Sequence, residues 1–175
     1  MRPWVYRAYR RLPARLRVLL VRIWTPSYWV GALCAVQRDD GAVLLVRQSY
    51  RRGWALPGGL LKRGESPADA AVRETREEVS VEVEVDGHPR VVVDTNRRRV
   101  DVVYPARLAS GGTADPAPLS NEILEARWCS LGGLPPLQPE TVLAFTELGL
   151  QELPSSSTEA STADSAEAST ADSAQ

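Results

Sequence analysis

The sequence predicts one globular domain that contains both strands and helices, and three observations support this prediction. The chain has 175 residues, enough for one domain with a sizeable core. Its composition, with 43% hydrophobic and 25% charged residues, is typical of a globular protein. Apolar runs that alternate like strands, separated by glycine-containing turns, are interleaved with segments whose apolar residues recur at helical spacing.

Residues 1–26 are predicted to form a basic amphipathic helical extension, interrupted at Pro13 and ended by Pro26. Before residue 23 the chain has seven arginines and no acidic residue. We expect this helix to pack on the domain with its arginines solvated. A homodimer contact and attachment to an anionic membrane surface are the alternatives. Nucleic acid is not an expected partner, because no recognised nucleic-acid-binding module accompanies the arginines.

Residues 27–150 are predicted to form the domain itself. Alternating apolar residues and turn signals predict two hairpins, two further strands and a helix near the end of the domain. The first hairpin turns at Asp39–Gly41 and the second at residues 95–99. The expected strands are Trp29–Gln37, Ala42–Gln48, Val81–Val85, Val91–Asp94, Val100–Arg107 and Ile123–Cys129, and the expected helix is Pro139–Leu148.

A helix is predicted to begin at Ser66–Pro67, after glycine turns at Gly58–Gly59 and Gly64. Serine is a favoured cap, proline fits the first helical position, and Asp69 complements the positive end of the helix dipole. One stripe of this helix is expected to be buried, with the carboxylates largely on another side. The residues of that stripe are Ala68, Ala71, Val72, Thr75 and Val79.

Three carboxylates, from Glu74, Glu77 and Glu78, cluster on this helix because residues three and four apart share a face. Like charges at that spacing repel by roughly 0.2–0.5 kcal/mol per pair. A hard divalent cation, Mg²⁺ above all, would offset the repulsion. A solvated charged face that includes Arg73 and Arg76 is the alternative interpretation.

The segment Gly59–Val81 resembles the box of the Nudix hydrolase family, MutT-like proteins included, whose pattern is G-x5-E-x7-R-E-U-x-E-E-x-G-U with U a bulky aliphatic residue. Thr75 replaces the first U, and Ser80 replaces the last glycine, so the helix is expected to end less cleanly. The matching positions are Gly59, Glu65, Arg73, Glu74, Glu77, Glu78 and Val81.

The resemblance implies a fold, a metal site and candidate catalytic residues. The fold would be an α/β/α sandwich with a mixed sheet. Glu74, Glu77 and Glu78, together with the backbone of Gly59, would bind Mg²⁺, with Mn²⁺ as a substitute. Glu65 and Arg73 would brace the loop against the helix, and the catalytic base would be Glu78, Glu77 or the more distant Glu122.

The resemblance also implies the reaction, which is hydrolysis of the pyrophosphate linkage in a nucleoside diphosphate derivative. A nucleoside triphosphate is the first choice of substrate, because the domain is small and has no second module. ADP-ribose or a nucleotide sugar is the alternative. A proline about sixteen residues past the box often marks ADP-ribose cleavage in the family, and Asn96 stands there instead. A non-catalytic nucleotide sensor is a third possibility, but such proteins commonly lose box carboxylates.

Residues Tyr50–Trp54 occupy the position from which the family often contacts substrate. Arg51 or Arg52 would bind phosphate, and Tyr50 or Trp54 would stack on a base. The three arginines Arg97–Arg99 are expected to be solvated on a hairpin tip, with a phosphate contact as the alternative.

The rest of the sequence bears on location rather than chemistry. The tail, residues 151–175, contains the octapeptide EASTADSA twice and is expected to be disordered. Cys34 and Cys129 are predicted to be reduced core thiols. No apolar run is long enough to span a membrane, and the protein is predicted to be cytoplasmic.

Overall fold

A computed structural model describes residues 9–112 and 114–150. The helices and strands include every predicted element in the predicted order, and the six predicted strands begin and end within two residues of the predicted bounds. They are α2 (Ala14–Trp24), β1 (Trp29–Gln37), β2 (Val43–Gln48), β3 (Trp54–Ala55), β4 (Gly58–Leu60), α3 (Pro67–Val79), β5 (Val83–Val85), β6 (Arg90–Asp94), β7 (Arg99–Leu108), β8 (Ile123–Cys129), the 3-10 turn Leu131–Gly133, and α4 (Pro139–Glu147).

The strands form one mixed sheet of eight strands. The central pair, β1 and β7, is parallel, with Trp29 opposite Arg99, whereas every other pairing is antiparallel. Both predicted hairpins are confirmed, since β1 pairs with β2 and β6 pairs with β7. The sequence did not predict β3 and β4. They are two and three residues long, and β4 is a strand because it pairs with β1.

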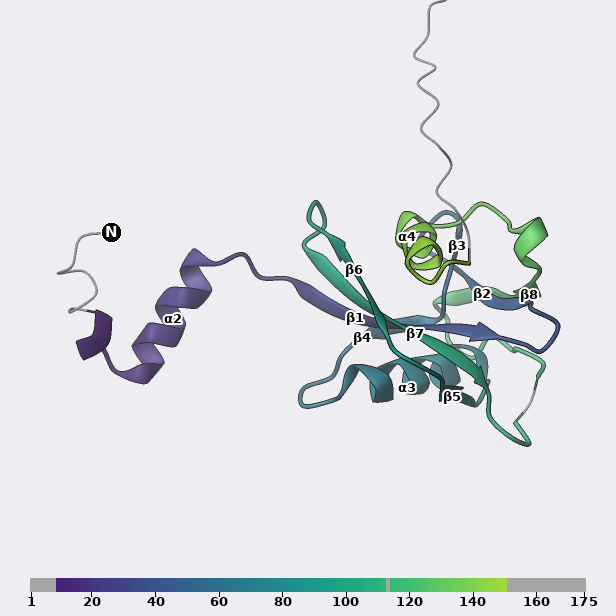
Figure 1. Ribbon diagram of the computed structural model, residues 1–175, viewed down its shortest axis with the longest axis horizontal. Coiled ribbons are helices and arrows are strands. Elements are labelled where there is room, and N and C mark those ends of the chain that lie inside the picture. Colours follow the sequence, from purple (N-terminus) through teal and green to yellow (C-terminus); the bar gives the residue numbers. More distant parts are fainter. Residues whose placement is uncertain (1–8, 113, 151–175) are drawn as a thin grey trace, which may run out of the picture.

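Two helices cover opposite faces of this sheet, with α3 on one side and α4 on the other (Figure 1). Alternate residues of β1 face the two helices, and all six central ones are buried. Ala32, Cys34 and Val36 share a core with α3, whereas Leu33 and Ala35 share the second core with α4. The α/β/α sandwich is confirmed, and both cysteines are buried and free.

Helix α3 begins as predicted and ends at an unusual residue. The Ser66 hydroxyl accepts a hydrogen bond from the Asp69 amide at 3.2 Å, and Pro67 is the first helical residue. The expectation that Ser80 would end the helix less cleanly is wrong, because Ser80 takes the left-handed conformation with φ 60° and the helix ends after Val79. That conformation favours glycine, so serine is strained where the family pattern has glycine.

The buried face of α3 differs from the prediction at several positions. Ala70 is fully buried, whereas Ala68 is only half-buried. Glu78 is buried as well, with 8% of its surface exposed, so it does not point away from the protein as predicted. The turn that leads into β4, here called the β4 turn, places the Gly58 amide against the Glu78 carboxylate. Helical spacing alone cannot predict this long-range contact.

Helix α2 stands away from the sheet (Figure 1). The chain breaks at Pro13 and the helix ends before Pro26, as predicted. None of its residues Ala14–Trp24 is buried, so the prediction that it packs on the domain is wrong. Within residues 9–112 and 114–150, every helix is too short or too polar to cross a bilayer. The predictions for residues 1–8 and for the tail 151–175 lie outside the described residues.

Candidate active site

A cavity of about 530 Å³ lies beside the box, between the start of β1, the β4 turn, α3 and the β6–β7 hairpin. Acidic, basic and aromatic side chains from segments far apart in the sequence meet there. Its lining residues are Trp29, Tyr50, Gly58, Gly59, Leu60, Glu74, Glu78, Arg97, Arg99 and Glu122.

Two glycines let the backbone approach the carboxylates of α3. The Gly58 amide donates a hydrogen bond to Glu78 Oε2 at 3.0 Å, and Gly58 has φ +147°. A Cβ at Gly58 would lie 2.2 Å from the Ala32 carbonyl oxygen. A Cβ at Gly59 would lie 2.6 Å from the carboxylate carbon of Glu74. Glycine is therefore required at position 58, where the clash is with backbone, whereas a side chain at position 59 would displace the Glu74 carboxylate.

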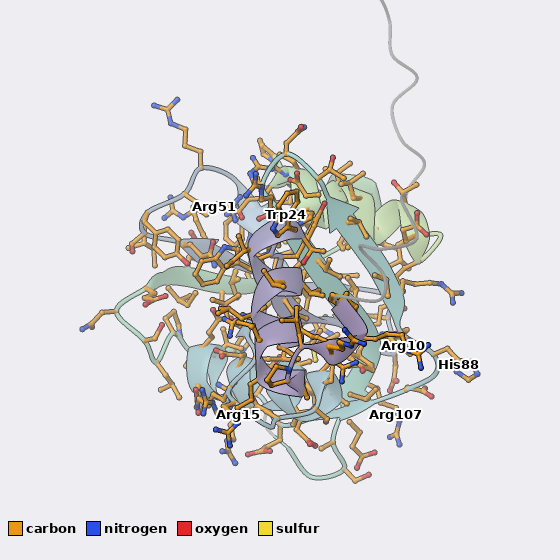
Figure 2. All side chains as sticks on the ribbon, turned by 90° about the vertical axis from the view of Figure 1, so that its left-hand side faces the viewer. Arg10, Arg15, Trp24, Arg51, His88 and Arg107 are labelled. Atoms are coloured by element: carbon orange, nitrogen blue, oxygen red, sulfur yellow. The ribbon has the colours of Figure 1, made fainter. Side chains whose placement is uncertain are left out.

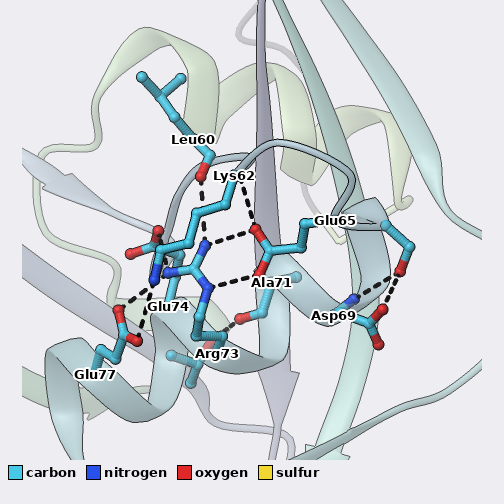
Figure 3. Close-up of polar contacts among 10 residues, drawn as sticks. Leu60, Lys62, Glu65, Asp69, Ala71, Arg73, Glu74 and Glu77 are labelled. Carbon is cyan, nitrogen blue, oxygen red and sulfur yellow. Dashed lines mark hydrogen bonds and ion pairs between the residues drawn. The ribbon is translucent and has the colours of Figure 1, made fainter.

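Arg73 braces the loop against the helix, as the resemblance implied (Figure 3). Its guanidinium donates to both carboxylate oxygens of Glu65, with Nε–Oε1 2.7 Å and Nη2–Oε2 2.9 Å. The same group donates to Glu74 at 2.7 Å and to Glu77 at 3.0 Å. The Arg73 hydrogen bonds hold the pKa of the Glu65 carboxyl at about 2. Glu65 and Arg73 are thus a structural pair outside the cavity lining, and Arg73 fixes where Glu74 lies.

Glu78 is the most perturbed carboxylate of the cavity. Burial raises the pKa of its carboxyl to about 7, and the charges of Glu74 and Glu122 act in the same direction. The Gly58 amide opposes them. Three carboxylates around one cavity therefore create an excess of negative charge that a bound cation would relieve.

Basic and aromatic residues also line the cavity. Arg99 donates to the buried carboxylate of Asp101 at 2.8 Å, and Gly31, which pairs with Asp101 across the sheet, leaves room for that carboxylate. Arg97 pairs with Asp94 at 2.8 Å. Trp29 is 67% exposed at the start of β1. The sequence predicted solvated arginines here and did not single out Trp29. Parallel pairing of Trp29 with Arg99 brings these side chains together.

A model of the NUDIX domain family matches residues 27–147 of the chain. The chain belongs to the Nudix family.

The Nudix relatives include a MutT-like protein from Streptomyces ambofaciens, 35% identical over 86 residues, which are 49% of this chain and 56% of the relative. The human 8-oxo-dGDP phosphatase is 31% identical over 131 residues, covering 71% of this chain and 39% of that protein. A solved structure of an ADP-ribose pyrophosphatase from Streptococcus suis is 31% identical, with a TM-score of 0.55 over 71% of this chain and 89% of that chain. This chain spans little more than half the length of the Streptomyces relative and less than half of the human one.

Nudix hydrolases generally use divalent metals, and the cavity has the oxygen donors that such ions prefer. Glu74, Glu78 and Glu122 all line it, beside the backbone of Gly59. In the arrangement of residues 9–112 and 114–150, no three acidic side chains are close enough together to enclose an ion. The donor set fits a hard cation in its chemistry, since every donor is an oxygen atom, but the side chains would have to move closer together to enclose one.

Glu77 is the box carboxylate that lies outside the cavity lining. It is half exposed and pairs with Arg73 and, at 3.6 Å, with Lys62. Exposed ion pairs of this kind are weak, so its side chain is not firmly held. The three predicted metal-binding carboxylates thus divide into two that line the cavity, as Gly59 also does, and one that lies outside the lining.

Of the four predicted substrate contacts, one lines the cavity and three do not. Tyr50 lines the cavity. Arg51 pairs with Glu140 of α4, and Arg52 is exposed, so neither is among the cavity-lining residues. Trp54 is buried in the core beneath α4, with the guanidinium of Arg127 4.2 Å from its ring centre. Trp54 is therefore a packing residue, and the prediction that it stacks on a base is corrected.

Proposed function

We propose that this chain is a Mg²⁺-dependent Nudix hydrolase that cleaves the pyrophosphate linkage of a nucleoside diphosphate derivative, with a nucleoside triphosphate as the preferred substrate. The observation that supports it best is that one cavity is lined both by carboxylates, called here its acidic wall, and by arginines, called here its basic wall. A polyphosphate needs both, because cations on either side offset its charge.

The acidic wall would hold the metal through Glu74, Glu78, Glu122 and the Gly59 backbone. Glu77 is one helical turn from Glu74 and would complete this set by releasing its weak surface pairs. When bound, the metal neutralises phosphate charge and lowers the pKa of a coordinated water.

The basic wall would bind and orient the substrate. Arg99 is held by the buried carboxylate of Asp101, so it would bind an anion at little cost in side-chain entropy. Arg97 also lines the cavity, but it is half-exposed and its pair with Asp94 is weaker. Trp29 and Tyr50 present aromatic faces to the same cavity, which suit stacking on a nucleobase. Arg51 is engaged by Glu140 and is the weaker candidate for a phosphate contact.

Two glutamates compete for the role of general base. Glu122 and Glu78 line the cavity, whereas Glu77 does not. Glu78 has one carboxylate oxygen committed to the Gly58 amide, which leaves Oε1 to accept a proton from the attacking water. Its raised pKa suits proton transfer near neutral pH, but a bound cation would lower that pKa again. The pH profiles of Glu78→Gln and Glu122→Gln would distinguish the two.

The test is product release from nucleoside triphosphates, 8-oxo-dGDP, ADP-ribose, nucleotide sugars and dinucleotides, with Mg²⁺, with Mn²⁺ and with a chelator. Glu78→Gln keeps the shape of the side chain and is expected to slow turnover at least ~10²-fold. Glu82→Gln, the same change at an exposed residue outside the cavity lining, is the matched control and should retain turnover. Unchanged turnover in Glu78→Gln would contradict the assigned site.

ADP-ribose is the second candidate substrate, because the Streptococcus suis relative is described as an ADP-ribose pyrophosphatase. The best substrate of the panel decides between them. If no compound turns over while nucleotides still bind, the chain is a sensor on the Nudix fold and the hydrolase proposal is wrong.

A further inference from the structure

Helix α2 carries an apolar stripe that no other described part of the chain covers. Leu16, Leu19, Leu20, Ile23 and Trp24 follow the i, i+3, i+4, i+7, i+8 spacing of one helix face. Leu19 is 50% exposed, Ile23 68% and Trp24 84%. The other side of the helix, at Val18 and Val21, shares a hollow of about 350 Å³ with Tyr9.

Arginines border this stripe on both sides. At 100° per residue, Arg15 and Arg22 lie beside Leu19, and Arg17 lies beside Trp24. Figure 2, viewed from the side of α2, shows Arg10 and Arg15 toward one end of the helix and Trp24 at the other. The chain has no acidic residue before Asp39, so nothing in this segment balances the positive charge.

We propose that α2 docks this protein on an anionic lipid bilayer, with the stripe Leu16–Leu19–Leu20–Ile23–Trp24 inserted at the interface and Arg15, Arg17 and Arg22 on the lipid headgroups. The long aliphatic stems of arginine allow the guanidinium to reach headgroups while the neighbouring apolar residues are buried. Tryptophan is favoured at the boundary between lipid and water.

Charge and area favour a bilayer over a second copy of the chain. Two α2 helices packed stripe to stripe would place arginines beside arginines with no carboxylate between them. The helix of 11 residues is about 16 Å long, so one stripe of five side chains is a small contact surface. A stable protein interface buries about 800 Å² per partner.

Docking in this way would also bring the cavity to the membrane. Only residues 25–28 separate α2 from Trp29, the first residue of β1 and part of the cavity lining. Four residues span at most about 14 Å. The cavity mouth would therefore lie close to the headgroups, and the proposal goes beyond the proposed hydrolysis without depending on it.

The experiment is sedimentation of the full chain with phosphatidylcholine vesicles, with and without phosphatidylglycerol. Binding is expected only with the anionic lipid and should weaken as salt rises. Leu19→Gln with Ile23→Gln is expected to reduce partitioning at least about tenfold, and Arg15→Gln with Arg22→Gln by a similar factor.

Arg47→Gln with Arg107→Gln is the matched control, since it changes the net charge equally at exposed residues of the sheet. Its binding should stay within about twofold of the parent. Equal binding of all variants, or no binding of the parent, overturns the proposal. A dimer in light scattering that the Leu19–Ile23 variant dissociates, without vesicle binding, would assign the stripe to a second copy instead.

Tryptophan fluorescence is a second measurement, which distinguishes the loss of lipid contact from the loss of the helix in a variant. Trp24, 84% exposed, should shift its fluorescence to shorter wavelength on anionic vesicles. The shift should be absent in Trp24→Phe, which keeps the helix. A shift that persists in Trp24→Phe would mean that another part of the protein meets the lipid.

Discussion

Helices α2 and α3 are similar in length and amphipathic pattern but differ in what their faces meet. Each starts beside a proline, and they have 11 and 13 residues. One side of α3 is buried against the sheet and its Arg73 is bound by three carboxylates, whereas α2 buries no residue. An amphipathic pattern therefore predicts that a helix has a partner surface, and the tertiary structure decides whether that surface is in the same domain.

The largest expected difference is in kcat, between substitutions beside α3 and substitutions in α2. Gly59→Ala places a Cβ 2.6 Å from the Glu74 carboxylate carbon and should displace that group, with a loss of kcat of about tenfold or more. Gly132→Ala, whose Cβ would meet no atom within 4 Å, is the control and should keep full activity. Leu19→Gln with Ile23→Gln in α2 should also leave nucleotide turnover unchanged in the absence of lipid. Equal kcat for Gly59→Ala and Gly132→Ala would remove the assigned role of the β4 turn.

The next largest difference concerns stability, because shortening an apolar side chain should destabilise the protein more in α3 than in α2. Val79 of α3 is completely buried, so Val79→Ala is expected to lower the free energy of unfolding by about 1–3 kcal/mol. Ile23→Ala in α2 removes an apolar side chain that is 68% exposed and should change it by less than about 0.5 kcal/mol. Denaturant melts of both variants measure the difference. A large effect of Ile23→Ala would show that α2 packs on the domain.

A smaller effect on the free energy of unfolding is expected from the residues that end the two helices. Ser80 ends α3 in the left-handed conformation, whereas Thr25 ends α2 in an extended one. Ser80→Gly should raise the unfolding free energy by about 1 kcal/mol, because glycine takes that conformation without strain. Thr25→Gly should give no gain. Thermal melts would reveal the difference, and a destabilised Ser80→Gly variant would contradict the strain argument.

The smallest prediction concerns the acid side of the stability profile. The Arg73 hydrogen bonds lower the pKa of folded Glu65 to about 2, below its ordinary value of 4.5. A depressed folded pKa stabilises the protein above the unfolded pKa, and that contribution is lost as pH falls from about 4.5 toward 2. Glu65→Gln should therefore be less stable than the parent at neutral pH, and the gap should narrow on acidification.

Glu84→Gln removes a carboxylate from an exposed pair with Arg107 and serves as the comparison for Glu65→Gln. Its melting temperature should stay close to that of the parent at every pH, because exposed ion pairs contribute little. A gap between the parent and Glu65→Gln that is the same at all pH values would mean that Arg73 braces the loop through packing rather than charge.

Local chemistry made much of this fold and site predictable from the sequence. The Ser66 cap and Pro67 define the start of α3, and the spacing of Glu65 and Arg73 defines their pair, because these interactions join residues no more than eight positions apart. The strands and hairpins follow from alternation and turn residues, which also depend on neighbours.

The features that the sequence did not predict depend on long-range pairing. Gly58–Leu60 is a strand only because β1 lies beside it, and Glu78 is buried only because the Gly58 amide lies over it. Trp54 looked like a substrate contact but fills the core beneath α4. Trp29 and Arg99 are 70 positions apart in the chain and become neighbours through the parallel pairing of β1 with β7.

The sequence by itself determined the family, the box helix and the residue types of the acidic wall, because each is a short-range pattern. The tertiary structure alone decided which carboxylates line the cavity, which arginines face them and which helix lies against the sheet. Burial and charge pairing depend on side chains brought together from distant segments. The free face of α2 is the clearest case, since its sequence pattern and that of α3 satisfy the same helical periodicity.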